Sequence, residues 1–156
     1  MKTPSILMTA ATLGLAACGT YSAPLPPSPY GAAMVTIADK APFGTYLVDG
    51  SGRALYILEG QRNGAGMDRC MGGCLGAWPP LHTSGPPTGG PAINSALLGT
   101  MTMHGAAHVT YSGWPLYYYH RDRAPGDTTG QHVTDRWGTW HLLSPNGEPI
   151  RPTGSY

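Results

Sequence analysis

The stretch TYLVDGSGRALYIL, residues 45–58, places two short apolar runs on either side of an Asp-Gly-Ser-Gly turn. An Asp-Gly pair between such runs is a strong β-hairpin signal, because these residues tolerate the backbone angles of a tight turn. The same plan returns in HVTYSGWPLYYY, residues 108–119, with Ser112 and Gly113 at the turn. Residues 137–143, WGTWHLL, are a third candidate strand.

The two hairpin segments align with each other. Residues 48–56 (VDGSGRALY) match residues 110–117 (TYSGWPLY) with one residue inserted, and a Gly-rich loop follows each hairpin. No long stretch combines helical periodicity with capping residues, although residues 93–98 allow one short helical turn. We therefore expect a small, loop-rich, all-β domain of antiparallel hairpins, sandwich-like or barrel-like, with an internal two-fold repeat that buries a shared face.

The first residues have the form of an export signal. Lys2 precedes a run of about a dozen apolar or small residues, which ends in LAAC at positions 15–18. A helix that crosses a bilayer needs roughly 20 apolar residues, so this run is too short. The LAAC ending resembles the lipobox of bacterial lipoproteins, which implies cleavage after residue 17 and a lipid on the thiol of Cys18. The alternative is a plain secretory signal with an incidental cysteine.

The composition of the mature chain limits its organisation and its partners. Loss of Lys2 leaves eight basic and eight acidic residues, and a neutral chain lacks the positive surface that nucleic-acid binding needs. We expect a lipidated Cys18 and Pro-rich tether over residues 18–35, one β domain over 36–146 and a flexible tail over 147–156. The expected address is the cell envelope, with the membrane as partner through the lipid. Gly19 favours the periplasmic face of the outer membrane if the host is Gram-negative.

A six-residue motif points to a family. The stretch YYYHRD, residues 117–122, fits the pattern Yx(FWY)xxD. With its flanks GWPLYY (113–118) and DRAPGDTTGQ (122–131), it resembles the second repeat of the bacterial secreted-repeat lipoproteins. The first repeat departs from the motif, because Leu58 replaces its aromatic residue and Gln61 its acid.

Three other stretches extend the resemblance. CMGGC (70–74) and WPPL (78–81) resemble the central segment of that family, and the pair Trp140-His141 resembles its closing strand. The likeness therefore covers roughly residues 45–145. It implies an architecture and a place in the envelope, but no molecular activity.

Cys70 and Cys74 are the cysteines that remain once Cys18 is lipidated. Outside the cytoplasm, a close pair most often forms a disulfide. Cα atoms four residues apart in a strand are about 13 Å apart, whereas a disulfide needs about 7 Å or less. The segment must therefore turn, which the glycines at 72 and 73 permit.

A metal or redox site is the alternative role for this pair. Two thiolates can hold a soft ion such as Cu(I), and thioether or imidazole ligands can complete its shell. The candidate set is Cys70, Cys74, Met101, Met103 and His104. Met101 and Met103 are equally well explained as core or loop residues.

A second candidate site combines aromatic rings with carboxylates. Tyr117 and Tyr119 point to the same face of a strand. Together with Trp114 they either fill the core or present rings to a sugar or peptide ligand. Asp122 and Asp127 flank a Pro-Gly turn, but two carboxylates supply few of the six to eight oxygens that Ca²⁺ prefers.

The sequence contains no Ser nucleophile motif, phosphate-binding loop or metalloprotease helix. We therefore expect a lipid-anchored envelope protein that is not an enzyme, has no resident cofactor and serves as a binding or structural module. The alternative function is periplasmic copper handling or thiol redox chemistry through Cys70 and Cys74. An enzyme ranks third.

Overall fold

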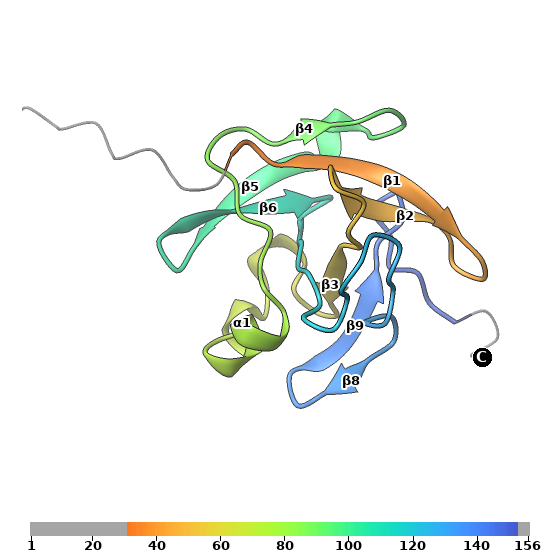
Figure 1. Cartoon of the computed structure of the whole chain (residues 1–156). Coiled ribbons are helices and arrows are strands. Elements are labelled where there is room, and N and C mark those ends of the chain that lie inside the picture. Colours follow the sequence, from red (N-terminus) through yellow and green to blue (C-terminus); the bar gives the residue numbers. More distant parts are fainter. Residues whose placement is uncertain (1–30, 153–156) are drawn as a thin grey trace, which may run out of the picture.

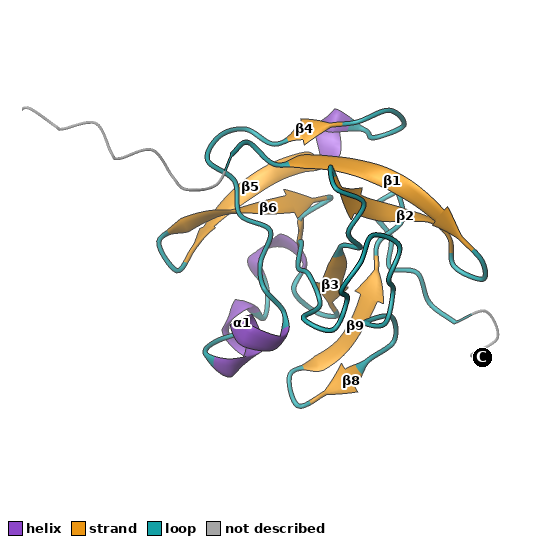
Figure 2. Cartoon of the chain, viewed as in Figure 1, coloured by secondary structure: helices purple, strands orange, loops and turns teal. Residues whose placement is uncertain are grey.

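The computed structural model describes residues 31–152. The expected signal peptide, the Cys18 anchor and most of the tether lie outside these residues. Strands predominate and the helices are short (Figure 2), which confirms the expected all-β class. The strands form three small sheets rather than a closed barrel. Within the described range, no helix has the length and apolar character that crossing a membrane requires.

Each sheet has three strands, in the orders β2-β1-β4, β3-β9-β8 and β5-β6-β7 (Figure 1). Short 3-10 helices and one α-helical turn lie in the connections. The strands are β1 (Met34–Lys40), β2 (Gly44–Asp49), β3 (Tyr56–Leu58), β4 (Thr88–Gly89), β5 (Leu98–Met103), β6 (Ala106–Tyr111), β7 (Trp114–Pro115), β8 (Thr134–Asp135) and β9 (Gly138–Leu142). The helices are η1 (Arg62–Gly64), η2 (Met67–Arg69), α1 (Gly73–Ala77) and η3 (Ser95–Leu97).

The second hairpin forms as its sequence predicts. β6 and β7 are antiparallel around Ser112 and Gly113, whose φ angles are 51° and 79°. Two consecutive positive φ angles are the mark of the tight turns that join hairpin strands.

The first hairpin is shorter than residues 45–58 suggest. Its turn closes with the bridge between Val48 and Ala54, but β3 then leaves β2 and pairs with β9. One edge of β2 is paired along its whole length with β1, a strand that the sequence patterns did not indicate. On the other edge, the N–H of Leu47 donates to the carbonyl of Leu143 at 2.9 Å, so the segment after β9 lies where a longer first hairpin would have continued. In the same way, β6 pairs with the unexpected strand β5.

The two repeats meet at equivalent tyrosines. The backbone N–H of Tyr56 donates to the carbonyl of Tyr117 at 2.8 Å, and the N–H of Tyr117 donates to the carbonyl of Tyr56 at 2.8 Å. These residues occupy the same position in the alignment of the two repeats. The pairing therefore relates the repeats by an approximate two-fold axis, as an internal duplication implies.

The repeats also exchange their closing segments. WPPL, which ends at Leu81, follows the first hairpin but accepts a hydrogen bond from Val109 of the second, at 2.9 Å. WHLL, which ends at Leu143, follows the second hairpin but accepts one from Leu47 of the first, also at 2.9 Å. The segment that follows each hairpin therefore hydrogen-bonds to the hairpin of the other repeat.

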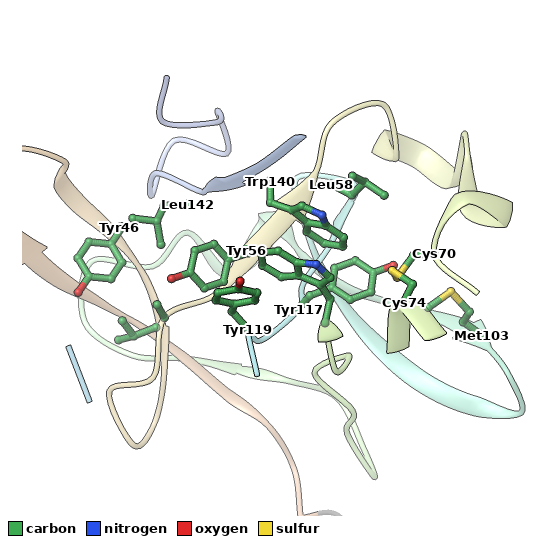
Figure 3. Packing of buried hydrophobic residues seen from close by; sticks show 13 residues of the cluster. Tyr46, Tyr56, Leu58, Cys70, Cys74, Met103, Tyr117, Tyr119, Trp140 and Leu142 are labelled. Carbon is green, nitrogen blue, oxygen red and sulfur yellow. A yellow bond between two sulfur atoms is a disulfide. The ribbon is translucent and has the colours of Figure 1, made fainter. Parts of the chain in front are cut away.

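An aromatic cluster fills the space between the repeats. The indoles of the two closing segments, Trp78 and Trp140, stack with ring centroids 3.9 Å apart and planes 9° apart. Tyr119 stacks on Trp78 at 4.2 Å. Tyr56 meets Trp78 edge-on at 5.6 Å, and Tyr117 meets Trp140 edge-on at 5.3 Å. Figure 3 shows the rings of Tyr56, Tyr117, Tyr119 and Trp140 gathered within this cluster.

The fold extends slightly beyond the domain borders expected from composition. β1 begins at Met34, inside the segment assigned to the tether. Pro149 bridges to Leu143, and the N–H of Ile150 donates to Leu142 at 2.8 Å, so these residues of the expected tail are attached to the sheet. The Pro-rich composition on both sides concealed these contacts, because proline is common in both tethers and strand ends.

Gly130 offers a test of how tightly the aromatic cluster packs. A Cβ atom at this position would lie 2.9 Å from Tyr56 and 3.0 Å from Trp78. We expect Gly130→Ala to lower the free energy of unfolding by about 1–3 kcal/mol, the usual cost of overpacking. Urea unfolding followed by tryptophan fluorescence measures it. Gly76→Ala is the matched control, because its Cβ meets nothing within 4 Å and alanine favours a helix by up to about 1 kcal/mol. Equal stability of the two variants would contradict the packing.

Candidate functional site

The acid of the Yx(FWY)xxD motif forms a buried hydrogen-bond centre. Asp122 is 7% exposed. One of its carboxylate oxygens accepts the hydroxyl of Tyr56 at 2.7 Å. The other accepts the backbone N–H and the hydroxyl of Thr129, at 2.9 and 2.6 Å. Tyr56 belongs to the first repeat and Asp122 to the second, so the motif's acid binds the opposite repeat.

The first repeat makes the reciprocal contact. The hydroxyl of Tyr117 donates to the amide oxygen of Gln61 at 3.0 Å. Gln61 occupies the position of the motif's acid, and it is fully buried. Its amide nitrogen donates to the carbonyl of Gly66 at 3.1 Å. The departure from the motif therefore keeps an acceptor oxygen where the opposite tyrosine needs one.

Electrostatics keep both phenols protonated. Burial, followed by the hydrogen bond to Asp122, raises the pKa of Tyr56 far above its ordinary value. Burial also raises the pKa of Tyr117, although the hydrogen bond to Gln61 lowers it in part. Both hydroxyls therefore serve as hydrogen-bond donors rather than as bases. We name these two contacts, Tyr56–Asp122 and Tyr117–Gln61, the reciprocal clasp.

The aromatic and acidic residues of the second candidate site do not share one surface. Tyr117 and Tyr119 lie in the aromatic cluster, whereas Trp114 packs in a separate apolar cluster and donates from Nε1 to the carbonyl of Gly147 at 3.2 Å. All three rings are buried. Of the two roles that the sequence left open for them, the structure supports the core.

Asp127 stabilises a turn. One of its carboxylate oxygens accepts the backbone N–H groups of Arg123 and Ala124, at 2.8 and 2.9 Å. These hydrogen bonds lower the pKa of its carboxyl. Both oxygens of Asp122 already accept hydrogen bonds from the protein, so the two carboxylates act as separate anchors of the loop between them.

Cys70 and Cys74 form the expected disulfide, with Cα atoms 5.0 Å apart. The chain turns between η2 and α1, and both cysteines are fully buried. The sulfur atoms therefore occupy the interior and are joined to each other.

The other residues of the proposed copper set have different surroundings. Met103 packs in the same cluster as the disulfide, close to Cys74 (Figure 3). Met101 is partly exposed, and His104 is exposed in the turn between β5 and β6, with φ 52°. Among residues 31–152, no group of three or more His, Cys, Asp or Glu side chains is placed to hold a metal ion.

The structure adds Asp135, which sequence analysis did not single out. One carboxylate oxygen accepts Nε1–H of Trp78 at 2.9 Å and Nε1–H of Trp140 at 3.1 Å. The other accepts the backbone N–H of Trp137 at 2.9 Å. A single carboxylate thus holds both stacked indoles. The only sequence signal is an Asp two residues before a Trp-Gly pair, which is typical of a turn.

Two buried histidines also emerge from the structure. His108 lies within hydrogen-bond distance of the Leu116 carbonyl, at 2.6 Å through Nε2, and burial lowers its pKa to about 4. His141 is 4% exposed, and burial lowers its pKa although Glu59 lies 3.9 Å away. Among the described residues, no hydrogen-bond partner is found for either ring nitrogen of His141 or for Nδ1 of His108.

A double-mutant cycle tests the reciprocal clasp. We expect Tyr56→Phe to lower the free energy of unfolding by about 1–3 kcal/mol, because the buried Asp122 carboxylate loses a donor. Tyr56→Phe with Asp122→Asn should show a coupling energy between about 0.5 and 3 kcal/mol in urea unfolding. Tyr46→Phe is the control, since Tyr46 belongs to the same cluster and no hydrogen bond of its hydroxyl is found among the described residues. Additive effects of the two substitutions would argue against the clasp.

The pKa of His108 predicts how stability depends on pH. The folded-state pKa, about 4, lies below the ordinary value of about 6.5, so the unfolded chain takes up the proton first. The contribution of neutral His108 to the free energy of unfolding is therefore complete above about pH 6.5. It is lost as the pH falls towards 4, and the total loss is about 3 kcal/mol. Urea midpoints between pH 7.5 and 4 should fall less steeply in His108→Gln than in the original protein. His120→Gln, at an exposed position, should leave the dependence of the urea midpoint on pH unchanged. The prediction is refuted if His108→Gln leaves this dependence unchanged as well.

Comparison with known proteins finds a family that resembles the second repeat. Residues 101–144 match the model of a family described as a secreted repeat of unknown function. No curated protein and no solved structure matches the chain. The matched residues run from within β5 to Ser144, directly after the closing segment WHLL, and they contain the Yx(FWY)xxD motif. This stretch of the chain is thus similar to the secreted-repeat family, as its motif predicts.

Proposed function

We propose that this chain is a lipid-anchored protein of the cell envelope whose folded domain is a non-catalytic structural or binding module. The reciprocal clasp is the observation that carries the non-catalytic role. The polar groups of the motif are buried, and they hydrogen-bond to each other across the two repeats. A catalytic acid or base must be accessible to its substrate, and it needs a donor or acceptor atom that is free to exchange a proton with that substrate. The motif offers neither, because its chemistry is used to join the repeats.

Two observations support an address outside the cytoplasm. Residues 101–144 match a secreted repeat, and secreted repeats belong to extracellular or envelope proteins. The Cys70–Cys74 disulfide suits an oxidising compartment. The LAAC ending at residues 15–18 supplies the attachment, since acylated cysteines anchor proteins with about 0.8 kcal/mol per buried CH₂ group.

The competing function, copper or redox chemistry through Cys70 and Cys74, has less support. A copper-binding thiolate pair must be reduced and open to the ion. Here the sulfur atoms are bonded to each other and buried. The disulfide closes the turn between η2 and α1, directly before Trp78 enters the aromatic cluster, which supports a structural role.

Lipid attachment is testable by mass spectrometry of the full chain expressed in a Gram-negative host. We expect a mature N-terminus at Cys18 that carries a diacylglyceryl group, and recovery of the protein in the detergent phase of a Triton X-114 partition. Cys18→Ser should abolish both results, because the acyl chain is attached to its thiol. The double variant Cys70→Ser, Cys74→Ser is the matched control and should stay lipidated. An unmodified Cys18 peptide from the original protein would refute the anchor, and turnover of an envelope substrate that one domain substitution abolishes would refute the non-catalytic role.

A further inference from the structure

A row of possible metal ligands crosses the sheet that contains β5 and β6. Met101 of β5 is paired with His108 of β6, and His108 is in turn paired with His82 through an isolated bridge. Directly opposed residues of antiparallel strands place their side chains on one face, with Cβ atoms about 4.5–5.5 Å apart. The rings of His82 and His108 confirm this arrangement, because their centroids are 6.1 Å apart. Two imidazoles and a thioether therefore share one face.

A second thioether lies on the same face. Met103 follows Met101 by two residues along β5, and such residues point to the same side of a strand. It belongs to the same buried cluster as Tyr117, and the ring of His108 meets that of Tyr117 edge-on at 4.8 Å. Both observations place Met103 and His108 on the side of the sheet that faces the cluster. β5 and β6 carry no Asp or Glu.

The hydrogen bonding of His108 determines where its proton lies. Nε2 is 2.6 Å from the carbonyl oxygen of Leu116, and a carbonyl can only accept, so Nε2 carries the hydrogen. Nδ1 then presents a lone pair. This atom is buried and has no hydrogen-bond partner among residues 31–152. The neutral form of an imidazole is the one that binds metals.

The unpartnered lone pair calls for an explanation, because a buried acceptor without a partner is unfavourable. Metal-binding histidines typically donate their second ring N–H to a carbonyl or carboxylate, which fixes the ring and its tautomer. His108 has this arrangement before any ion is bound. His82 and Met101 are partly exposed, so an ion can reach these two side chains from the solvent.

The donor set selects the kind of ion. Imidazole and thioether groups suit a soft ion such as Cu(I), whereas Mg²⁺ and Ca²⁺ prefer carboxylate and carbonyl oxygens. We propose that His82, Met101, Met103 and His108 form a binding site for a soft monovalent metal ion of the Cu(I) class. This site uses the two methionines of the set expected from sequence, but histidines replace the cysteines. It depends neither on the lipid anchor nor on reduction of the disulfide.

Ag(I) is the suitable probe, because it resembles Cu(I) and needs no reductant, so the disulfide stays intact. Silver nitrate is titrated into the purified full-length protein in a chloride-free buffer and followed by calorimetry. We expect saturable binding with a defined ratio of silver ions to protein chains. Met101→Leu and His82→Ala should each weaken the affinity by about tenfold or more, as loss of a ligand or of its support does. Leucine preserves the volume of methionine, so Met101→Leu should leave the fold intact.

Matched controls separate this site from adventitious binding. Met71→Leu and His120→Ala replace an exposed methionine and an exposed histidine away from the row, and both should leave the affinity unchanged. Long-range ¹H–¹⁵N spectra give a direct readout, in which Ag(I) should shift Nδ1 of His108 while Nε2 keeps its proton.

Several results would overturn the site. The first is that Ag(I) does not bind, and the second is that Met101→Leu and His82→Ala leave the Ag(I) affinity unchanged. The third is that Met71→Leu or His120→Ala lowers the Ag(I) affinity. The fourth is that the Nδ1 resonance of His108 does not shift when Ag(I) is added. Since the lipid anchor is measured separately at Cys18, failure of either proposal leaves the other standing.

Discussion

The hydrogen bonds between the two repeats are the constraint on which the domain depends. Tyr56 and Tyr117 pair through their backbones, and each sends its hydroxyl to an acceptor in the opposite repeat, Asp122 or Gln61. A buried phenol without an acceptor costs free energy comparable to a lost hydrogen bond. Neither repeat can therefore bury its motif tyrosine at low cost unless the other repeat is folded against it.

The exchanged closing segments reinforce this dependence. They bring Trp78 and Trp140 face to face between the hairpins, and Asp135 accepts both indole N–H groups. One carboxylate thus satisfies the two polar atoms that the stacked rings would otherwise bury. The disulfide lies on the segment that leads into Trp78, so it restrains the chain where one half of the stack begins.

Local signals in the sequence were sufficient for the turns, the repeat and the disulfide. Ser112 and Gly113 mark a hairpin because few residue pairs tolerate two positive φ angles. β1 was not predicted because it directly follows the Pro-rich segment. β5 alternates threonine and methionine over residues 100–103, but its methionines were interpreted as metal ligands or as core or loop residues. The role of the motif was beyond local analysis, since Tyr56 and Asp122 are 66 residues apart. The tautomer of His108 likewise depends on a carbonyl eight residues away, across a turn whose geometry the sequence patterns only outline.

The exchange of closing segments also governs when the protein can fold. Leu47 receives its partner Leu143 only after nearly the whole chain is available, and contacts between distant residues form slowly because a long loop must first close. A chain that crosses a membrane from its N-terminus would emerge with its first hairpin incomplete and its aromatic rings uncovered. A half-emerged chain would expose this apolar surface until the last strand arrives, and exposed apolar surface and unpaired strand edges promote aggregation.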